Sequence, residues 1–292
     1  METSVIIPVY NEEKSIGNCL ISLAKQTVKT EILVVDDGST DATVSKITGC
    51  VLLKQKHRGP GAARNLGASK ARGDILVFVD ADMEFEPDFI EKLIAPIEKG
   101  KTIGTFSKEE FLLNKDNVWA RCWNLNLGRS PEKMEPRDFD KNKSVIYIFF
   151  KNILQKIEGG EVTFNENQSH IFRAILNKQF DKVGGFETNV GYTDDWSLTR
   201  KLNTLATAAP GAKYYHLNPG SLEEVWKQAR WFGKNEFLTG SLIRKLYNLF
   251  RYCPAWALIS MRGFNFLIFK VVYNTAVCTS VLLSFFGESK YK

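Results

Sequence analysis

Residues 74–82 read Asp74-Ile75-Leu76-Val77-Phe78-Val79-Asp80-Ala81-Asp82, an apolar run that ends in two carboxylates with one residue between them. The run is short and rich in β-branched and aromatic residues, which predicts a buried parallel strand. Ligands of open α/β sheets lie beyond the carboxyl ends of the strands, so we expect Asp80 and Asp82 to face a cleft. Two neighbouring carboxylates attract a divalent cation, which can then hold a diphosphate. The simpler alternative is that Asp82 caps a helix or lies in a turn.

The composition is that of a globular chain. It has 292 residues, of which 44% are hydrophobic and 25% are charged, enough apolar side chains for a core and too few charges for a disordered chain. The net charge of +6 suits an anionic ligand or an anionic membrane surface. The sequence contains no known nucleic-acid-binding motif, so we expect no nucleic-acid partner.

The cysteines and the N-terminus predict a cytoplasmic protein. The five cysteines are scattered, and no pair has the spacing of a zinc finger or a redox motif, so we expect free thiols in a reducing compartment. The N-terminus lacks the charged-then-apolar pattern of a signal peptide, and an expected strand begins almost at once.

Strand and helix signals alternate through residues 1–106, which predicts an α/β fold with a mostly parallel sheet and helices on both faces. The expected strands are Val5–Val9, Glu31–Val35, Val51–Leu53 and Ile75–Val79, and the expected helices are Ser15–Gln26, Pro60–Ala71 and Pro87–Ile97. Proline at the first turn of a helix supports the last two starts.

The pattern weakens in residues 107–220. We expect helices at Asp116–Leu127 and Ser144–Ile157 around a polar loop, Ser130–Lys143, which can shape an acceptor site or a lid. Further elements are expected at Glu161–Phe164 (strand), at Asp194–Leu202 (helix) and up to His216 (strand). We predict one catalytic domain over 1–220, with a nucleotide-binding half (1–106) and an acceptor-binding half (107–220).

Residues 221–292 are predicted to form a helical membrane-associating or dimerising segment. Aromatic and basic residues alternate from Ser221, which is typical of an amphipathic helix at a membrane surface. A helix packed on the catalytic domain is the alternative. Residues 264–286 are apolar enough to span a bilayer but are interrupted by Asn265, Lys270 and Asn274. The run therefore predicts a spanning helix, an in-plane helix or a dimer contact.

Four ordered motifs in the first hundred residues resemble those of glycosyltransferase family 2. They are Val5-Ile6-Ile7-Pro8-Val9-Tyr10-Asn11-Glu12, Val34-Val35-Asp36-Asp37-Gly38-Ser39-Thr40-Asp41, Gly61-Ala62-Ala63-Arg64-Asn65-Leu66-Gly67 and Val79-Asp80-Ala81-Asp82. Further along, Val183-Gly184-Gly185-Phe186 and Asp194-Asp195-Trp196 resemble a second cluster of the family, in which Asp194 replaces the usual glutamate. The resemblance covers roughly residues 3–216 and implies the GT-A fold.

The resemblance implies transfer of a sugar from a nucleoside diphosphate, with inversion. Asp82 matches the aspartate that binds Mn²⁺ or Mg²⁺, Asp80 the one that contacts the ribose or a metal-bound water, and Asp37 the one that reads the base. Further implied donor contacts are Pro8, Tyr10, Glu12, Arg64 and Ala81. The alternatives are a helix cap for Asp37 after Thr40, a role shared by Asp36 or Asp41, a core position for Tyr10 and a surface position for Arg64.

On the acceptor side, the resemblance implies that Asp195 is the general base, with Asp194 beside it as the other candidate. A hydroxyl acceptor, on a glycan or a lipid-linked saccharide, needs such a base, whereas a polyprenyl or dolichyl phosphate does not, because it is already an oxyanion. His216 lies where some relatives have a third metal ligand, and a purely structural role is equally open. Trp196 can stack on a sugar or lie in the core.

Three other functions are alternatives to sugar transfer. A dinucleotide oxidoreductase is suggested by Gly59-Pro60-Gly61 before a helix, but Arg64 stands where a third glycine or alanine belongs. A nucleotidyltransferase needs a glycine-rich basic loop for a triphosphate, and none is visible near the N-terminus. A non-catalytic sugar-nucleotide sensor is disfavoured by the presence of Asp82 and Asp195. We expect a protein at the inner face of the cell membrane, bound peripherally or by one span.

Overall fold

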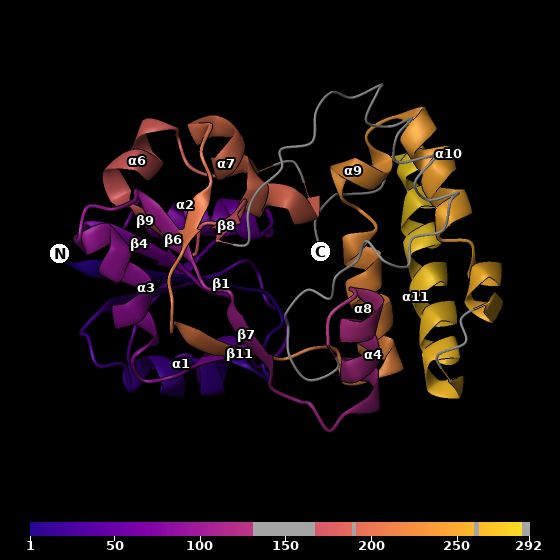
Figure 1. Cartoon of the computed structure of the whole chain (residues 1–292), viewed down its shortest axis with the longest axis horizontal. Coiled ribbons are helices and arrows are strands. Elements are labelled where there is room, and N and C mark those ends of the chain that lie inside the picture. Colours follow the sequence, from indigo (N-terminus) through magenta and orange to yellow (C-terminus); the bar gives the residue numbers. More distant parts are fainter. Residues whose placement is uncertain (131–166, 189–190, 260–262, 288–292) are drawn as a thin grey trace.

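The computed structural model describes residues 1–130, 167–188, 191–259 and 263–287. The predicted helix Ser144–Ile157, the predicted strand Glu161–Phe164 and nearly all of the predicted polar loop lie outside these residues. An α/β unit and a helical unit lie side by side in the molecule (Figure 1).

Within the described residues, the central sheet has eight strands in the order β3-β2-β1-β4-β9-β6-β10-β8. The strands are β1 Thr3–Val9, β2 Glu31–Asp36, β3 Val51–Lys54, β4 Ile75–Phe78, β6 Gly104–Phe106, β8 Gln168–Ser169, β9 Ala174–Leu176 and β10 Ala206–Ala208. β3, β2, β1 and β4 pair in parallel, as do β6 and β10, whereas β9 and β8 are antiparallel to their neighbours. The four predicted strands are confirmed, and the later short strands were not all predicted.

Both faces of the sheet are covered, because successive residues of a strand point to opposite sides. Val5 and Ile7 of β1 contribute to a core with α1 (Ile16–Ala24) and α3 (Phe89–Glu98). Ile6 faces the other way, into a core with α2 (Pro60–Ala68), α6 (Asn177–Lys182) and α7 (Ser197–Leu202). The predicted helices over residues 1–106 are therefore present, on both faces as predicted.

A small second sheet brings the end of the catalytic region back to the end of β4. Its order is β5-β11-β7, with β5 Met83–Phe85, β11 Lys213–His216 and β7 Glu109–Leu112. β11 runs antiparallel to β5, in a register that pairs His216 with Met83. The residue after Asp82 is therefore the direct strand neighbour of His216.

The helical unit has its own core. It consists of α4 (Val118–Asn126), α8 (Leu222–Phe232), α9 (Glu236–Thr239), α10 (Leu242–Arg251), the 3-10 helix η4 (Pro254–Ile259) and α11 (Phe264–Leu283). Trp123 of α4, Val225 of α8 and Phe269 and Tyr273 of α11 belong to one buried cluster. A helix from the middle of the chain thus packs with the C-terminal helices.

Candidate active site

The predicted carboxylates lie at the edge of the sheet where its parallel strands end. Asp36 ends β2, while Asp80 and Asp82 follow β4. Parallel strands present their carboxyl ends at one edge, which is where α/β proteins bind ligands. Asp194 and Asp195 come to this edge from the 3-10 helix η3 (Gly191–Trp196).

Arg64 joins these carboxylates. Its Nη2 donates to Asp80 Oδ1 (2.8 Å), and its Nη1 lies 2.7 Å from both Asp194 Oδ2 and Asp195 Oδ1. Arg64 is only 5% exposed, so the alternative of a surface arginine is wrong. A buried guanidinium shared by three carboxylates ties the donor-side strand to the predicted base.

Arg173, which the sequence analysis did not single out, holds Asp80 from the other side. It immediately precedes β9, its Nη1 donates to Asp80 Oδ2 (3.0 Å), and its guanidinium lies 5.8 Å from the centre of the Tyr214 ring. Burial would raise the pKa of Asp80, but Arg173 and Arg64 outweigh burial and hold that pKa well below its usual range. Both oxygens of Asp80 thus accept from arginines.

The two neighbouring carboxyls of η3 have different environments. Asp194 is buried, and burial raises its pKa to about 7 although Arg64 opposes the shift. The side chain of Asp195 is 28% exposed. Asp195 is therefore the more exposed carboxylate of this pair.

Residues of the α2 motif hold the turn before η3 in place. Asn65 donates through Nδ2 to the Phe186 carbonyl and accepts at Oδ1 from the Phe186 amide, both at 2.9 Å. Gly185 has a φ of +67°, and a Cβ there would collide with Asn65 Oδ1. A Cβ on Gly61 would lie 2.8 Å from the Glu187 carbonyl oxygen. The glycines thus permit the close approach that Arg64 needs.

Asp82 and His216 form the candidate metal site. His216 Nε2 lies 3.5 Å from Asp82 Oδ2, and the Leu217 amide donates to the Asp82 carbonyl (2.8 Å). Asp82 Oδ1 is buried, with no hydrogen-bond partner among the described residues. The described part of the chain contains no group of three metal-ligating side chains. One carboxylate and one imidazole fit Mg²⁺ or Mn²⁺, since Mg²⁺ is usually held by one or two carboxylates, waters and substrate phosphates.

Asp37, which is predicted to read the nucleotide base, is held by several donors. Its carboxylate accepts from the side chain of Gln55 (2.7 Å) and from the amides of Arg58 and Gly59 (2.8 Å each), and it lies 2.9 Å from His57 Nδ1. These contacts shape the loop that leads into α2. Asp37 therefore does not cap the helix after Thr40, and one of these donors must give way if Asp37 is to read a base.

The remaining predicted donor contacts surround this loop. Tyr10 stacks on His57 with ring centres 4.1 Å apart, so its ring lies at the strand ends and is not in the core. Asp41 accepts from the Thr43 amide in the turn before the 3-10 helix Val44–Lys46, whose N-cap residue is Thr43, so Asp41 is not its cap. Glu12 accepts from Ser15 Oγ (3.0 Å). The side chain of Ala81 is buried in the core, so the predicted contact with the donor falls to its backbone. Pro8, within β1, pairs with Val35.

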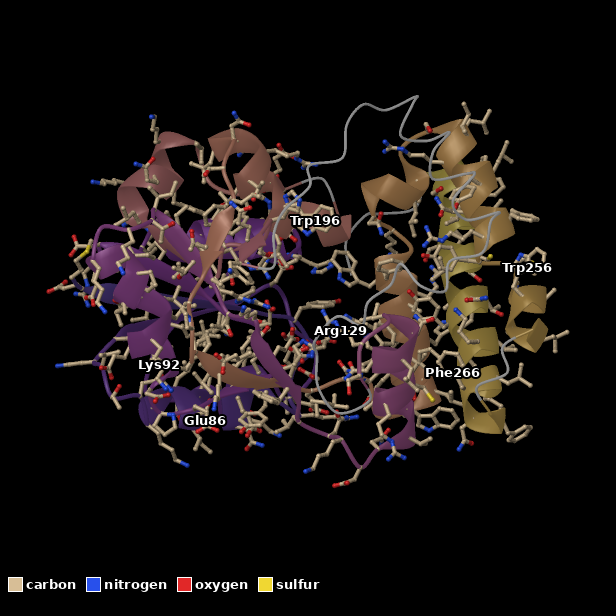
Figure 2. All side chains as sticks on the ribbon, in the orientation of Figure 1. Glu86, Lys92, Arg129, Trp196, Trp256 and Phe266 are labelled. Atoms are coloured by element: carbon tan, nitrogen blue, oxygen red, sulfur yellow. The ribbon has the colours of Figure 1, made fainter. Side chains whose placement is uncertain are left out.

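Trp196 is 41% exposed, which excludes the core position. Its ring stacks on His170, with centres 5.3 Å apart. In the view of Figure 2, Trp196 and Arg129 both lie between the α/β unit and the helical unit. The residue next to the predicted base thus presents an aromatic surface near the junction of the two units.

Comparisons with known proteins agree with this geometry. The model of the family "Glycosyl transferase family 2" matches residues 4–178. An uncharacterized glycosyltransferase of Haemophilus influenzae is 27% identical over 206 residues, covering 68% of this chain and 61% of that protein. A dolichol-phosphate mannosyltransferase of Pyrococcus furiosus is 38% identical over 117 residues, covering 37% of this chain and 33% of that protein. In both, the chain matches less than two thirds of the relative's own length.

Among solved structures, a mannosyltransferase from Pyrobaculum calidifontis, in complex with GDP-Man and Mn²⁺, has 18% identity and a TM-score of 0.50 over 97% of this chain and 73% of that one. This likeness confirms the predicted GT-A fold. The family match spans the four N-terminal motifs, the last of which contains Asp80 and Asp82. It removes the basis for the oxidoreductase and nucleotidyltransferase alternatives. The chain belongs to glycosyl transferase family 2.

Proposed function

We propose that this chain transfers a sugar, with inversion, from a nucleoside-diphosphate sugar to an acceptor, using Asp195 as the general base. The observation that carries the proposal is the arrangement around Arg64, which places Asp195 and Asp80 on one guanidinium. Inversion in one displacement needs donor and base on opposite sides of the reacting carbon, which suits carboxylates from two separate segments.

The residues divide the work. Asp195 takes the proton of an acceptor hydroxyl on its exposed side. Asp80, fixed by two arginines, contacts the ribose, and Tyr10 and Asp37 surround the base. Asp82 and His216 would hold Mn²⁺ or Mg²⁺, and the bound ion would neutralise charge on the leaving diphosphate.

The acceptor class has two candidates. An exposed carboxylate at Asp195 favours a hydroxyl of a glycan or of a lipid-linked saccharide. The alternative is a polyprenyl or dolichyl phosphate, supported by the name of the Pyrococcus furiosus relative. We further propose that the protein acts at the inner face of the cell membrane, bound peripherally or by one span. A homodimer through the C-terminal helices is the other use of that segment.

Nucleotide binding should depend on the metal. Isothermal titration with UDP and with GDP should show tight binding in Mn²⁺ and at least about tenfold weaker binding in EDTA, because the cation neutralises the diphosphate, whereas the Asp82 carboxylate without it carries the same sign of charge as the ligand. Asp82→Asn should weaken binding in Mn²⁺ and leave binding in EDTA unchanged. Equal affinities with and without Mn²⁺ for both nucleotides would refute the metal role.

A further inference from the structure

The long apolar helix α11 is a core helix of the helical unit. The chain has one described helix, Phe264–Phe286, that is long and apolar enough to cross a membrane, and 44% of its most apolar window is buried inside the protein. Phe269, Tyr273 and Val277 pack in the cluster shared with α4 and α8. To span a bilayer, α11 would have to leave these partners.

The polar side chains of α11 also bind within the helical unit. Lys270 Nζ donates to Asn126 Oδ1 of α4 (2.8 Å), and Ser280 Oγ donates to the Arg230 carbonyl of α8 (2.7 Å). Asn274 is 2% exposed and donates to the Cys253 carbonyl (3.3 Å). Two of the three polar interruptions that made the run ambiguous as a span, Lys270 and Asn274, are thus contacts of a packed helix, whereas Asn265 is exposed.

A different surface of the same unit is exposed and apolar. We call it the α10 face; its members are each between 42% and 74% exposed, and they are Leu242, Ile243, Leu246, Phe250, Trp256 and Leu258. Phe250 and Trp256 touch, with ring centres 5.3 Å apart, which joins α10 to η4. In Figure 2, Trp256 lies at the outer edge of the helical unit, away from the α/β unit.

The segment of sequence that carries the α10 face has charges of one sign. Residues 237–287 contain no aspartate or glutamate and five basic residues: Arg244, Lys245, Arg251, Arg262 and Lys270. Lys245 donates to the Ser284 carbonyl and lies 4.5 Å from the centre of the Phe285 ring, which adds the end of α11 to the surface. Apolar side chains beside cations suit the headgroup region of an anionic bilayer.

We propose that the α10 face docks in the plane of an anionic phospholipid surface, while α11 stays packed in the protein. The proposal deepens the proposed membrane location and decides it in favour of peripheral binding. It does not depend on the reaction, because nucleotide binding in vesicle-free solution tests the active site separately.

The test is flotation of the full chain with vesicles of phosphatidylglycerol and phosphatidylcholine, against vesicles of phosphatidylcholine alone. Binding should be several-fold tighter on the anionic vesicles and weaken as NaCl rises from 0.1 to 0.5 M. Sodium carbonate should release the protein. Resistance to carbonate would show a spanning α11, and no flotation, with or without a dimer in light scattering, would show that lipid does not cover this face.

Matched variants locate the surface. Leu246→Ser together with Phe250→Ser should lower vesicle affinity at least about tenfold, because burying each side chain is worth roughly a factor of ten or more. Leu246→Ser alone is compared with Ile21→Ser on α1, since their exposed fractions are 57% and 55%; only Leu246→Ser should weaken binding. Each variant should bind UDP or GDP as the wild type does, which verifies folding. Wild-type flotation by the Leu246/Phe250 double variant would overturn the proposal.

The charge contribution is tested in the same way. Arg244→Gln with Arg251→Gln should reduce the preference for anionic vesicles by at least about tenfold, because each basic residue near an anionic surface contributes about a factor of five. Lys99→Gln with Lys101→Gln removes two exposed cations from the α/β unit and should leave flotation unchanged. An equal loss in both double variants would show attraction by net charge alone, against a defined face.

Discussion

Asp195→Asn is expected to lower sugar transfer to a hydroxyl acceptor by about 10²–10⁴-fold while nucleotide and metal still bind. Asparagine keeps the shape of the side chain and can still bond to Arg64, but it cannot take a proton. Initial rates with alkyl glycosides as acceptors, and titration calorimetry with UDP and GDP, measure the two effects. A loss of nucleotide affinity equal to the loss of rate would contradict the assignment of Asp195 as base.

Asp194→Asn is the control for this experiment. Asp194 is buried, whereas the side chain of Asp195 is 28% exposed, so an acceptor reaches Asp195 more readily. We expect a smaller loss of transfer than for Asp195→Asn. If Asp195→Asn transfers sugar at nearly the wild-type rate and Asp194→Asn does not, Asp194 is the base. If both transfer well, the acceptor needs no base, and polyprenyl phosphate replaces the glycosides in the assay.

Arg64→Met should lower the free energy of unfolding at pH 7 by about 3–5 kcal/mol, because it leaves carboxylates buried without their cation. The depressed pKa of Asp80 stabilises the fold above the ordinary aspartate range, and this stability is lost as the pH falls through the folded-state value. Arg64→Met removes one of the two arginines that depress this pKa, so the variant lacks part of this stabilisation already at pH 7. Its deficit should therefore be largest near neutral pH and shrink below about pH 4, where the carboxyls of the unfolded chain and of the variant become neutral.

Arg72→Met provides the matched comparison. Arg72 also pairs with a carboxylate, Glu31 Oε1 at 2.9 Å, but its side chain is 81% exposed. An exposed pair contributes about 0–1 kcal/mol, so this variant should unfold at nearly the wild-type urea concentration. Urea titrations of both variants at pH 7 and pH 4 make the comparison. Equal, small deficits at pH 7 would show that the cluster around Arg64 is not held as described.

The sequence predicted the parts of the site that depend on local pattern. The end of β4, the turn at Gly184 and Gly185, and the pair Asp194-Asp195 each carry a signal within a few residues. The structure adds how they meet. Arg64 is predicted to reach the donor, and the structure adds that it joins carboxylates up to 131 positions away in the chain. No local pattern encodes a contact of that separation.

Arg173 shows the same limit more strongly. It follows Phe172 and precedes a three-residue strand, and no nearby motif indicates which carboxylate it contacts. Only the antiparallel placement of β9 beside β4 brings it to Asp80. The available signal was its position directly before an apolar triplet, where an arginine is commonly buried only with a charged partner.

α11 could not be interpreted from composition, because a core helix and a spanning helix are both long and apolar. The two kinds of helix differ in what covers each of their faces. One helix that covers α11 is α4, which lies more than a hundred residues earlier in the chain. The exposed side chains of α10 were visible in the sequence only as a mixture of basic and apolar residues.

The most direct test of the proposed function is release of sugar from a panel of UDP- and GDP-sugars with Mn²⁺, for the wild type and for Asp82→Asn. The proposed reaction predicts slow metal-dependent hydrolysis of at least one donor by the wild type, abolished by EDTA and reduced at least about tenfold in Asp82→Asn. Binding of a nucleotide sugar without hydrolysis under any of these conditions, with or without acceptors, would instead identify a sugar-nucleotide sensor and contradict catalysis.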